Sequence, residues 1–224
     1  ISTLQAEMFR RGYYWDKAFH LKCNNCSKEY QHDASTCIDC GSTEFTKPDP
    51  SQLVYPKWLI DSRNSMEQQF IDVLREIEYD LNITDDAFII LIKEYYVDPE
   101  TNEVAFYRIK EIMRGDPIFM RIVADKRGVR GGRYRTCPLH RDQVSGFSEN
   151  QTHCETCNHK LEDVHHVNTA GAGKTQYYLE GEVIHTSKYH PSKLYGRAPV
   201  STLWRQAMTL TAMDNYMYTA YSKR

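Results

Sequence analysis

The longest apolar pattern in the chain lies between residues 65 and 125 and predicts one helix followed by three strands. Its first part has apolar residues at helical spacing, with charged residues on the other side. Ser65 is a candidate N-cap, because Gln68 stands three positions later and completes a capping box. The expected buried positions of this helix are Met66, Phe70, Val73, Leu74, Ile77 and Leu81.

The apolar period then changes from helical to extended. Residues 87–92 form a continuous apolar run that ends in two tyrosines and a valine, which is typical of a strand buried on both faces. Turn residues at 98–102 precede a return strand at 104–109. A second turn at 114–117 leads into a third strand at 118–123. The pattern predicts one helix packed on a small, mostly antiparallel sheet, and therefore an α+β fold.

Two C-x-x-C knuckles stand ten residues apart near the start of the chain, and they predict a metal site. Each knuckle turns tightly enough to aim two thiolates at one ion, and Gly41 after the second pair permits the turn. The alternatives are four unmetallated buried thiols or two disulfides. His32 is a possible competitor, although four thiolates leave it no position. The expected ligands are Cys23, Cys26, Cys37 and Cys40.

A second metal candidate combines a C-x-x-H pair with a C-x-x-C knuckle thirteen residues beyond it. With the first site it uses all seven cysteines, so the count divides into a Cys₄ and a Cys₃His site. His153 and His159 are alternative nitrogen ligands. We expect two structural zinc ions per chain, each contributing about 10 kcal/mol of apparent folding free energy. The expected ligands of the second site are Cys137, His140, Cys154 and Cys157.

Composition narrows the classes of function. The 224 residues carry a net charge of −2, so no global field attracts nucleic acid or anionic lipid. No apolar run approaches the roughly 20 residues needed to cross a bilayer. An odd number of cysteines arranged as C-x-x-C indicates metal binding in a reducing compartment rather than disulfides. The chain starts at Ile1 and ends inside an expected helix, so we expect it to be a fragment.

A basic, glycine-rich segment spans residues 126–135. Between Arg121 and Arg141 the chain has seven Lys/Arg and one Asp, a local charge of +6. This loop is a candidate contact for phosphates or an acidic partner, and the alternative is a solvated loop. The candidate contact residues are Arg127, Arg130, Arg133 and Arg135.

No catalytic motif is found. The A-G-A-G-K-T segment at 170–175 lacks the first glycine of a phosphate loop, where Asn168 stands instead. The residues after it have strand character, whereas a phosphate loop must open a helix. Once the cysteines are assigned to metals, no nucleophilic thiol is left over. We therefore expect no enzymatic activity, no small-molecule substrate and no membrane contact.

The last stretch ends a strand in V-I-H at residues 183–185, followed by Tyr195-Gly196, Pro199 and a long helix to at least Tyr221. The helix carries two apolar stripes, so it packs between neighbours, within the fold or across subunits. The first stripe is Leu203, Ala207, Leu210, Met213, Met217 and Tyr221. The second is Trp204, Met208, Ala212 and Tyr216.

This run resembles the portal proteins of tailed viruses, in which a strand ending in V-I-H, a Tyr-Gly loop with Pro and a long helix occur in this order. The helix near Phe70, the strand at Ala87 and the Asp116-Pro117 turn also follow the order of the portal wing region. Arg197-Ala198 departs from the family, which often has Ser there, and the zinc-ribbon-like insertions are not typical of bacteriophage members. With these insertions the chain looks more like the portals of archaeal tailed viruses.

The resemblance implies a homo-oligomeric ring, typically of twelve subunits, at one capsid vertex. Double-stranded DNA would pass through it non-specifically, and the packaging terminase, capsid and tail connector proteins would dock on it. It implies a location in the virion, and in the host cytoplasm during assembly. The competing class is a zinc-ribbon nucleic-acid-binding or transcription-type protein, although residues 20–45 carry no excess of Lys/Arg over acids. A metal-dependent enzyme ranks third, since it needs an open coordination position.

The expected organisation has five parts. Residues 1–19 form an N-terminal helical and aromatic segment, and residues 20–46 a first zinc-ribbon-like module. Residues 51–135 form the α+β core, and residues 136–160 a second zinc-ribbon-like module. Residues 161–224 complete the core with strands and the long C-terminal helix.

Overall fold

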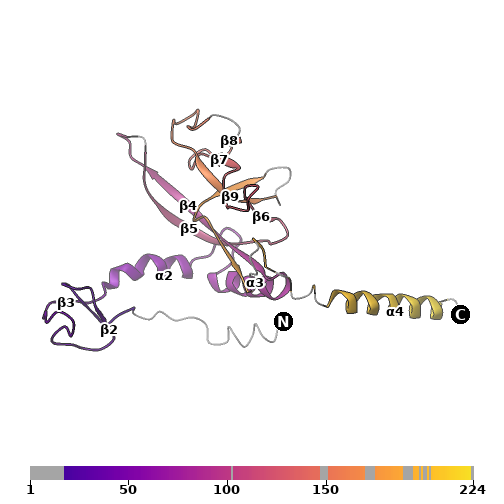
Figure 1. The fold of residues 1–224 in the computed structure, drawn as a ribbon, viewed down its shortest axis with the longest axis horizontal. Coiled ribbons are helices and arrows are strands. Elements are labelled where there is room, and N and C mark those ends of the chain that lie inside the picture. The colour runs from indigo at the N-terminus through magenta and orange to yellow at the C-terminus, as the bar shows by residue number, and fades with distance from the viewer. Residues whose placement is uncertain are drawn as a thin grey trace.

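The computed structural model describes residues 18–101, 103–146, 151–169, 175–188, 194–196, 198, 201 and 203–222. It has a central body of sheets and helices, with a small strand module at one end and a helix at the other (Figure 1). Residues 1–17 of the expected N-terminal helical and aromatic segment, residues 170–174 and Pro199 lie outside the described residues. The α+β class is confirmed by three α-helices and three small antiparallel sheets among the described residues.

The first sheet has the order β2-β1-β3 and consists of β1 (Leu21–Cys23), β2 (Glu29–Tyr30) and β3 (Phe45–Thr46). A short 3₁₀ helix, η1 (Pro50–Leu53), and α2 (Val54–Asp61) then lead to the body. The sequence pattern did not predict these two elements. The Asp49 side chain accepts a hydrogen bond from the Ser51 backbone N–H at 2.9 Å, which caps η1.

The main helix, α3, spans Phe70–Ile83, so the predicted start at Ser65 is wrong. The N-cap is Gln69, which forms a capping box with Asp72. The preceding residues form a turn instead, because the Asn64 side chain accepts hydrogen bonds from the backbone N–H groups of Met66 and Gln68. Met66 is consequently exposed rather than part of the buried face.

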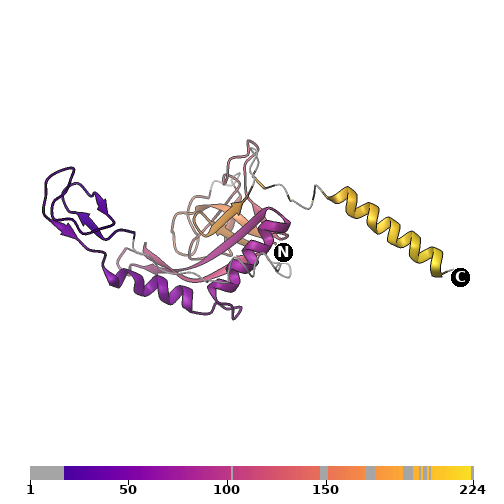
Figure 2. The ribbon, with the colours of Figure 1, turned by 90° about the horizontal axis from the view of Figure 1, so that it is seen from below.

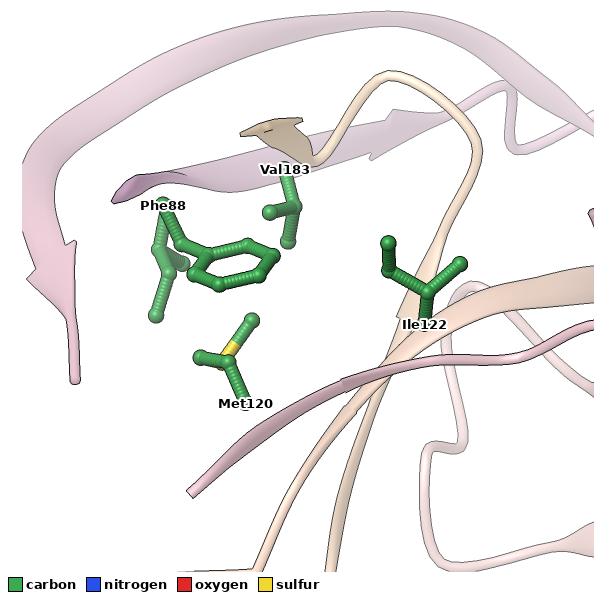
Figure 3. Packing of buried hydrophobic residues seen from close by; sticks show 5 residues of the cluster. Phe88, Met120, Ile122 and Val183 are labelled. Atoms are coloured by element: carbon green, nitrogen blue, oxygen red, sulfur yellow. The ribbon is translucent and has the colours of Figure 1, made fainter. Parts of the chain in front are cut away.

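The predicted hairpin is confirmed as β4 (Asp86–Val97) paired with β5 (Val104–Gly115), and β5 is longer than expected. The first half of β4 is buried on both faces, as predicted. One face packs against Val73 and Ile77 of α3. The other face packs Phe88 against Met120, Ile122 and Val183 (Figure 3). Beyond residue 92 the strand is only partly buried, because the hairpin extends away from α3 (Figure 1).

The third predicted strand exists as β6 (Met120–Ile122), but it does not join this hairpin. It pairs with β9 (Glu162–Asn168), in a five-stranded sheet that also holds β7 (Tyr134–Thr136), β8 (Val144–Gly146) and β10 (Gln176–Leu179). The free edge of β4 is taken by β11 (Val183–Ser187) instead. Since that partner comes ninety residues later in the chain, a local pattern could not reveal it.

The C-terminal prediction of a long helix is confirmed as α4 (Trp204–Ser222). It lies well away from the body in both views (Figures 1 and 2). Every described side chain of α4 is exposed, so packing within this fold does not explain its apolar stripes. Among the described residues, no helix is both long and apolar enough to cross a membrane.

Candidate metal centres

The four cysteines of the first module, residues 20–46, come together at one end of the β2-β1-β3 sheet. Their sulfur atoms all lie within 4.8 Å of one another. The Sγ atoms of Cys23 and Cys40 are 3.6 Å apart, and those of Cys26 and Cys37 are 3.4 Å apart. Cys23 and Cys37 are buried, whereas Cys26 and Cys40 are exposed. The first cluster is therefore open to solvent on one side.

The second module, residues 136–160, brings together Cys137, His140, Cys154 and Cys157, again within 4.8 Å. The Nδ1 atom of His140 lies 3.8 Å from Cys137 Sγ and 3.6 Å from Cys154 Sγ. The Sγ atoms of Cys137 and Cys157 are 3.5 Å apart. Cys137 and Cys154 are buried and pack against Leu161.

The structure places His140, and neither alternative histidine, in the second group. The His153 ring lies beside the Thr152 hydroxyl at 2.9 Å, and His159 faces Glu162. His32 likewise lies outside the first group. The predicted sets of four side chains are thus the sets that the fold assembles.

Both groups fit a tetrahedral metal ion. Zinc–sulfur bonds of about 2.3 Å at tetrahedral angles place two sulfurs about 3.8 Å apart, and a sulfur and an imidazole nitrogen about 3.6 Å apart. The observed separations match these values to within a few tenths of an ångström. A disulfide would need about 2.05 Å, and all seven cysteines are free, so the disulfide alternative is excluded. Each group can hold one metal ion.

The backbone after each C-x-x-C knuckle adopts a left-handed conformation. Ser27, Gly41 and Asn158 follow the three knuckles, with φ values of 60°, 72° and 57°. Each backbone N–H donates to the carbonyl oxygen of the first cysteine of its knuckle, at 2.8–3.0 Å. The turn folds the two thiols toward the same point, and the sequence signalled it only at Gly41, since glycine adopts positive φ most readily.

Cys37 receives a hydrogen bond from outside its knuckle. The Tyr30 hydroxyl donates to Cys37 Sγ at 3.2 Å, and the Ile38 backbone N–H donates to the same hydroxyl oxygen at 2.9 Å. The Tyr30 hydrogen bond, together with backbone N–H groups of Cys40 and Asp39, lowers the pKa of Cys37 to about 6. The Tyr30 ring also packs within the module, since it lies edge-on to Phe45 at 5.6 Å.

Cys154 has the corresponding surroundings in the second module. Burial alone would raise its pKa, but the backbone N–H groups of Cys157 and Thr156 outweigh burial and lower the pKa to about 6. Cys154 Sγ lies 2.9 Å from Gln143 Oε1, and Gln143 Nε2 donates to the Thr156 hydroxyl at 2.6 Å. Gln143 was not identified from the sequence.

The second module is joined to the body by an ion pair whose carboxylate is buried. Arg141, the residue after His140, contacts Glu182 through Nη2, and Glu182 is 5% exposed. The same carboxylate accepts hydrogen bonds from the Tyr95 hydroxyl and the Leu179 backbone N–H, both at 2.7 Å. This cluster joins the metal group to β4 and to the turn between β10 and β11.

The basic loop is organised by Asp125, whose carboxylate accepts hydrogen bonds from the backbone N–H groups of Arg127 and Val129. Its predicted contact residues separate into two kinds. Arg130 lies 3.3 Å from His185 Nδ1, and Arg135 pairs with Asp163 at 3.4 Å. Arg127 and Arg133 are exposed, as Arg130 also is, and Arg133 lies over the ring of Tyr134.

The residues of the predicted V-I-H and Tyr-Gly elements meet at one joint next to Phe88. His185 Nε2 and the Gly196 backbone N–H both hydrogen-bond to Asp86 Oδ1 at 2.8 Å. The Tyr195 hydroxyl accepts from the Ile122 backbone N–H at 2.7 Å, and its ring lies edge-on to His185. Since Arg130 can only donate to Nδ1, the Nε2 atom of His185 carries the proton. This joint is the last part of the body that the structure describes before the segment leading to α4.

His166 of β9 is buried. Its ring lies edge-on to Phe88 at 6.1 Å, and neither ring nitrogen has a hydrogen-bond partner among the described residues. Burial, and then the charge of Arg130, lowers the pKa of His166 to about 4.

Neither the protein-family models nor the curated proteins searched gave a match to this chain.

Proposed function

We propose that this chain is a structural subunit of a viral portal, a ring at one capsid vertex through which double-stranded DNA passes during packaging and ejection. The observation that carries this proposal is α4. It is apolar on more than one face and exposed along its whole described length. A helix of this composition is stable in water only when neighbours cover it.

The apolar surface of α4 is large enough to hold subunits together. Four aromatic and five aliphatic side chains between residues 203 and 221 are 49–76% exposed. Together they offer on the order of 1,000 Å², against roughly 800 Å² per partner in a stable interface. Arg205 and Asp214 are the two charged residues of the helix. A second copy of this chain is therefore the partner that we propose for it.

The joint at Asp86 also supports the proposal. The V-I-H strand and the Tyr-Gly loop carry the resemblance to portal proteins, and they pack together where the chain leaves the body toward α4. The near-neutral charge suits a channel that must not retain DNA, because each neutralised phosphate adds affinity.

We also propose that both metal groups bind zinc and act as structural crosslinks. Cys₄ and Cys₃His sets are typical of structural zinc, and four protein ligands leave no position for a catalytic water. The modules then stiffen wing loops or contact capsid neighbours, and the protein has a mechanical rather than an enzymatic role. It acts in the virion and, during assembly, in the host cytoplasm, with terminase and tail connector proteins as further partners.

Negative-stain microscopy and mass determination of the full-length protein test the assembly. Closed rings, typically of twelve subunits, are expected. The double variant Leu210→Glu/Met217→Glu should prevent ring formation, because it places two charges on one stripe of α4. The control is Ile118→Glu in the turn before β6, outside both metal groups, where a side chain that is 65% exposed takes the same charge.

A stable monomer that binds DNA tightly at moderate salt would overturn the portal proposal. It would favour a zinc-ribbon nucleic-acid-binding protein. The observation that favours this alternative is the pair of exposed arginines, Arg127 and Arg133. The Tyr134 ring lies beneath Arg133, and the Tyr177 ring lies edge-on to Tyr134 at 6.1 Å. Substituting these two arginines should then weaken DNA binding and reduce its salt dependence.

A further inference from the structure

The two metal groups share a hydrogen-bonding feature that is not visible in their sequences. In each module, the first cysteine of the second knuckle, Cys37 or Cys154, receives two backbone N–H groups from its own knuckle. In each module a side chain from outside the knuckle also reaches that sulfur. It is Tyr30 in the first and Gln143 in the second, at 3.2 Å and 2.9 Å.

The two outer side chains differ in what they offer. The Tyr30 hydroxyl is already a donor to sulfur, since its oxygen accepts from the Ile38 N–H. Gln143 brings its side-chain amide to within 2.9 Å of Cys154 Sγ, and this amide has an NH₂ group as well as an oxygen to offer. A metal-bound thiolate has no proton, so it can only accept hydrogen bonds. The NH₂ group is therefore the end of the Gln143 amide that suits a metal-bound sulfur.

The surroundings of Gln143 fit an amide placed with Nε2 toward Cys154. Nε2 then donates to the thiolate, and Oε1 takes the place beside Thr156. The Thr156 hydroxyl now accepts from Nε2 at 2.6 Å, and it can donate to Oε1 instead, because a hydroxyl does both. The rest of Gln143 stays fixed. Its backbone carbonyl oxygen accepts a hydrogen bond from the Thr136 hydroxyl at 3.0 Å, and its backbone N–H donates to the His140 carbonyl oxygen at 3.2 Å.

We propose that Gln143 is the outer hydrogen-bond donor of the second metal site. It occupies the role that Tyr30 has in the first site. Such outer contacts typically change metal affinity by about 10–100-fold. The inference rests on metal binding by the second module and not on ring assembly, so the two can fail separately.

The test uses the full chain with Cys37→Ser, so that a chromophoric zinc chelator in competition reports on the second site. Gln143→Leu removes the donor, and Gln143→Glu keeps the shape but offers only acceptor oxygens. We expect at least about a tenfold loss of zinc affinity for Gln143→Leu and a larger loss for Gln143→Glu. The control is Gln151→Leu. Gln151 lies in the same module and donates to the His153 carbonyl and to Glu155 rather than to a sulfur.

Two spectroscopic signals separate a donor from a merely structural residue. In the cobalt-loaded protein, both Gln143 variants should shift the sulfur-to-cobalt charge-transfer band to lower energy, and Gln151→Leu should not. In the unsubstituted protein loaded with an NMR-active cadmium isotope, a Gln143 side-chain amide proton should couple to the metal. That measurement needs no variant to fold.

Three outcomes would overturn the inference. The first is wild-type zinc affinity in both Gln143 variants. The second is tighter binding by Gln143→Glu, which would mean that the carboxylate joins the metal as a ligand. The third is a cadmium-loaded protein in which the Gln143 amide protons show no coupling. A failure to bind zinc in the parent chain would instead refute the proposed metal site itself.

Discussion

The two metal modules have nearly the same ligand chemistry and opposite relations to the rest of the fold. The first module (module 1, residues 20–46) has its own sheet and lies at the far end of α2, away from the body (Figures 1 and 2). The second module (module 2, residues 136–160) follows β7 directly and shares the five-stranded sheet of the body. Its Arg141 is paired with the buried Glu182. The comparison shows that one kind of knuckle can support an independent flap or a crosslink within a body.

The largest expected difference follows loss of a metal ligand. The parent chain should contain two zinc ions, and Cys37→Ser and Cys154→Ser should each remove one. Each loss withdraws about 10 kcal/mol of apparent folding free energy from its module. For Cys37→Ser, hydrogen exchange should then increase only within residues 20–46. For Cys154→Ser, it should increase within residues 136–160 and also along β4, β7 and β9. Metal analysis with site-resolved hydrogen exchange checks this. Equal spread in the two variants would contradict the comparison, and one zinc or an iron centre would contradict the ligand assignment.

The second prediction concerns the connection itself. Glu182→Ala should destabilise the body by about 3 kcal/mol, because it leaves Arg141 without its buried partner. Urea denaturation of the metal-loaded protein measures the effect. The control Glu180→Ala, two residues away and exposed, should change the free energy of unfolding by less than about 0.5 kcal/mol. A similar small change in both variants would mean that module 2 is not held by this pair.

The third prediction is a pH dependence located in the body. The pKa of His166 is about 4 in the folded protein and 6.5 ordinarily, so the unfolded chain binds more protons between these values. The contribution of neutral His166 to the free energy of unfolding is therefore fully present above pH 6.5, and it is lost as the pH falls toward 4. The loss is about 2 kcal/mol at pH 5. His166→Leu should remove this part of the dependence. Denaturation of the parent chain and of His166→Leu at pH 7 and pH 5 measures this effect. The metal contribution cancels in the difference between the two proteins. Parallel dependence of the free energy of unfolding on pH in the two proteins would refute the prediction.

The smallest expected effect is that of Tyr30→Phe. It removes one hydrogen bond to Cys37, worth about 1 kcal/mol, and should weaken metal binding by module 1 by roughly fivefold. Chelator competition in a Cys154→Ser background measures it. Hydrogen exchange in the five-stranded sheet should not change, because module 1 forms its own sheet. A change there would show that the first module is coupled to the body after all.

The Cys spacing and the helical period of α3 determined a good part of this picture. A C-x-x-C knuckle closes over four residues, so sequence alone identified the seven cysteines that meet in two groups. The face of Val73 and Ile77 was also predictable, since helical spacing needs no distant partner. The start at Ser65 failed because Asn64 offered the backbone a competing turn.

What only the tertiary structure decided depends on residues far apart in the chain. The pairing of β11 with β4 and of β6 with β9 set which strands share a sheet, and it buried His166. The choice of His140, and the approach of Tyr30 and Gln143 to single sulfurs, likewise required the folded loops. The physical reason is one of range. Periodicity and knuckle geometry are fixed by neighbouring residues, whereas a buried polar group takes whichever distant partner the packed chain brings within hydrogen-bond distance.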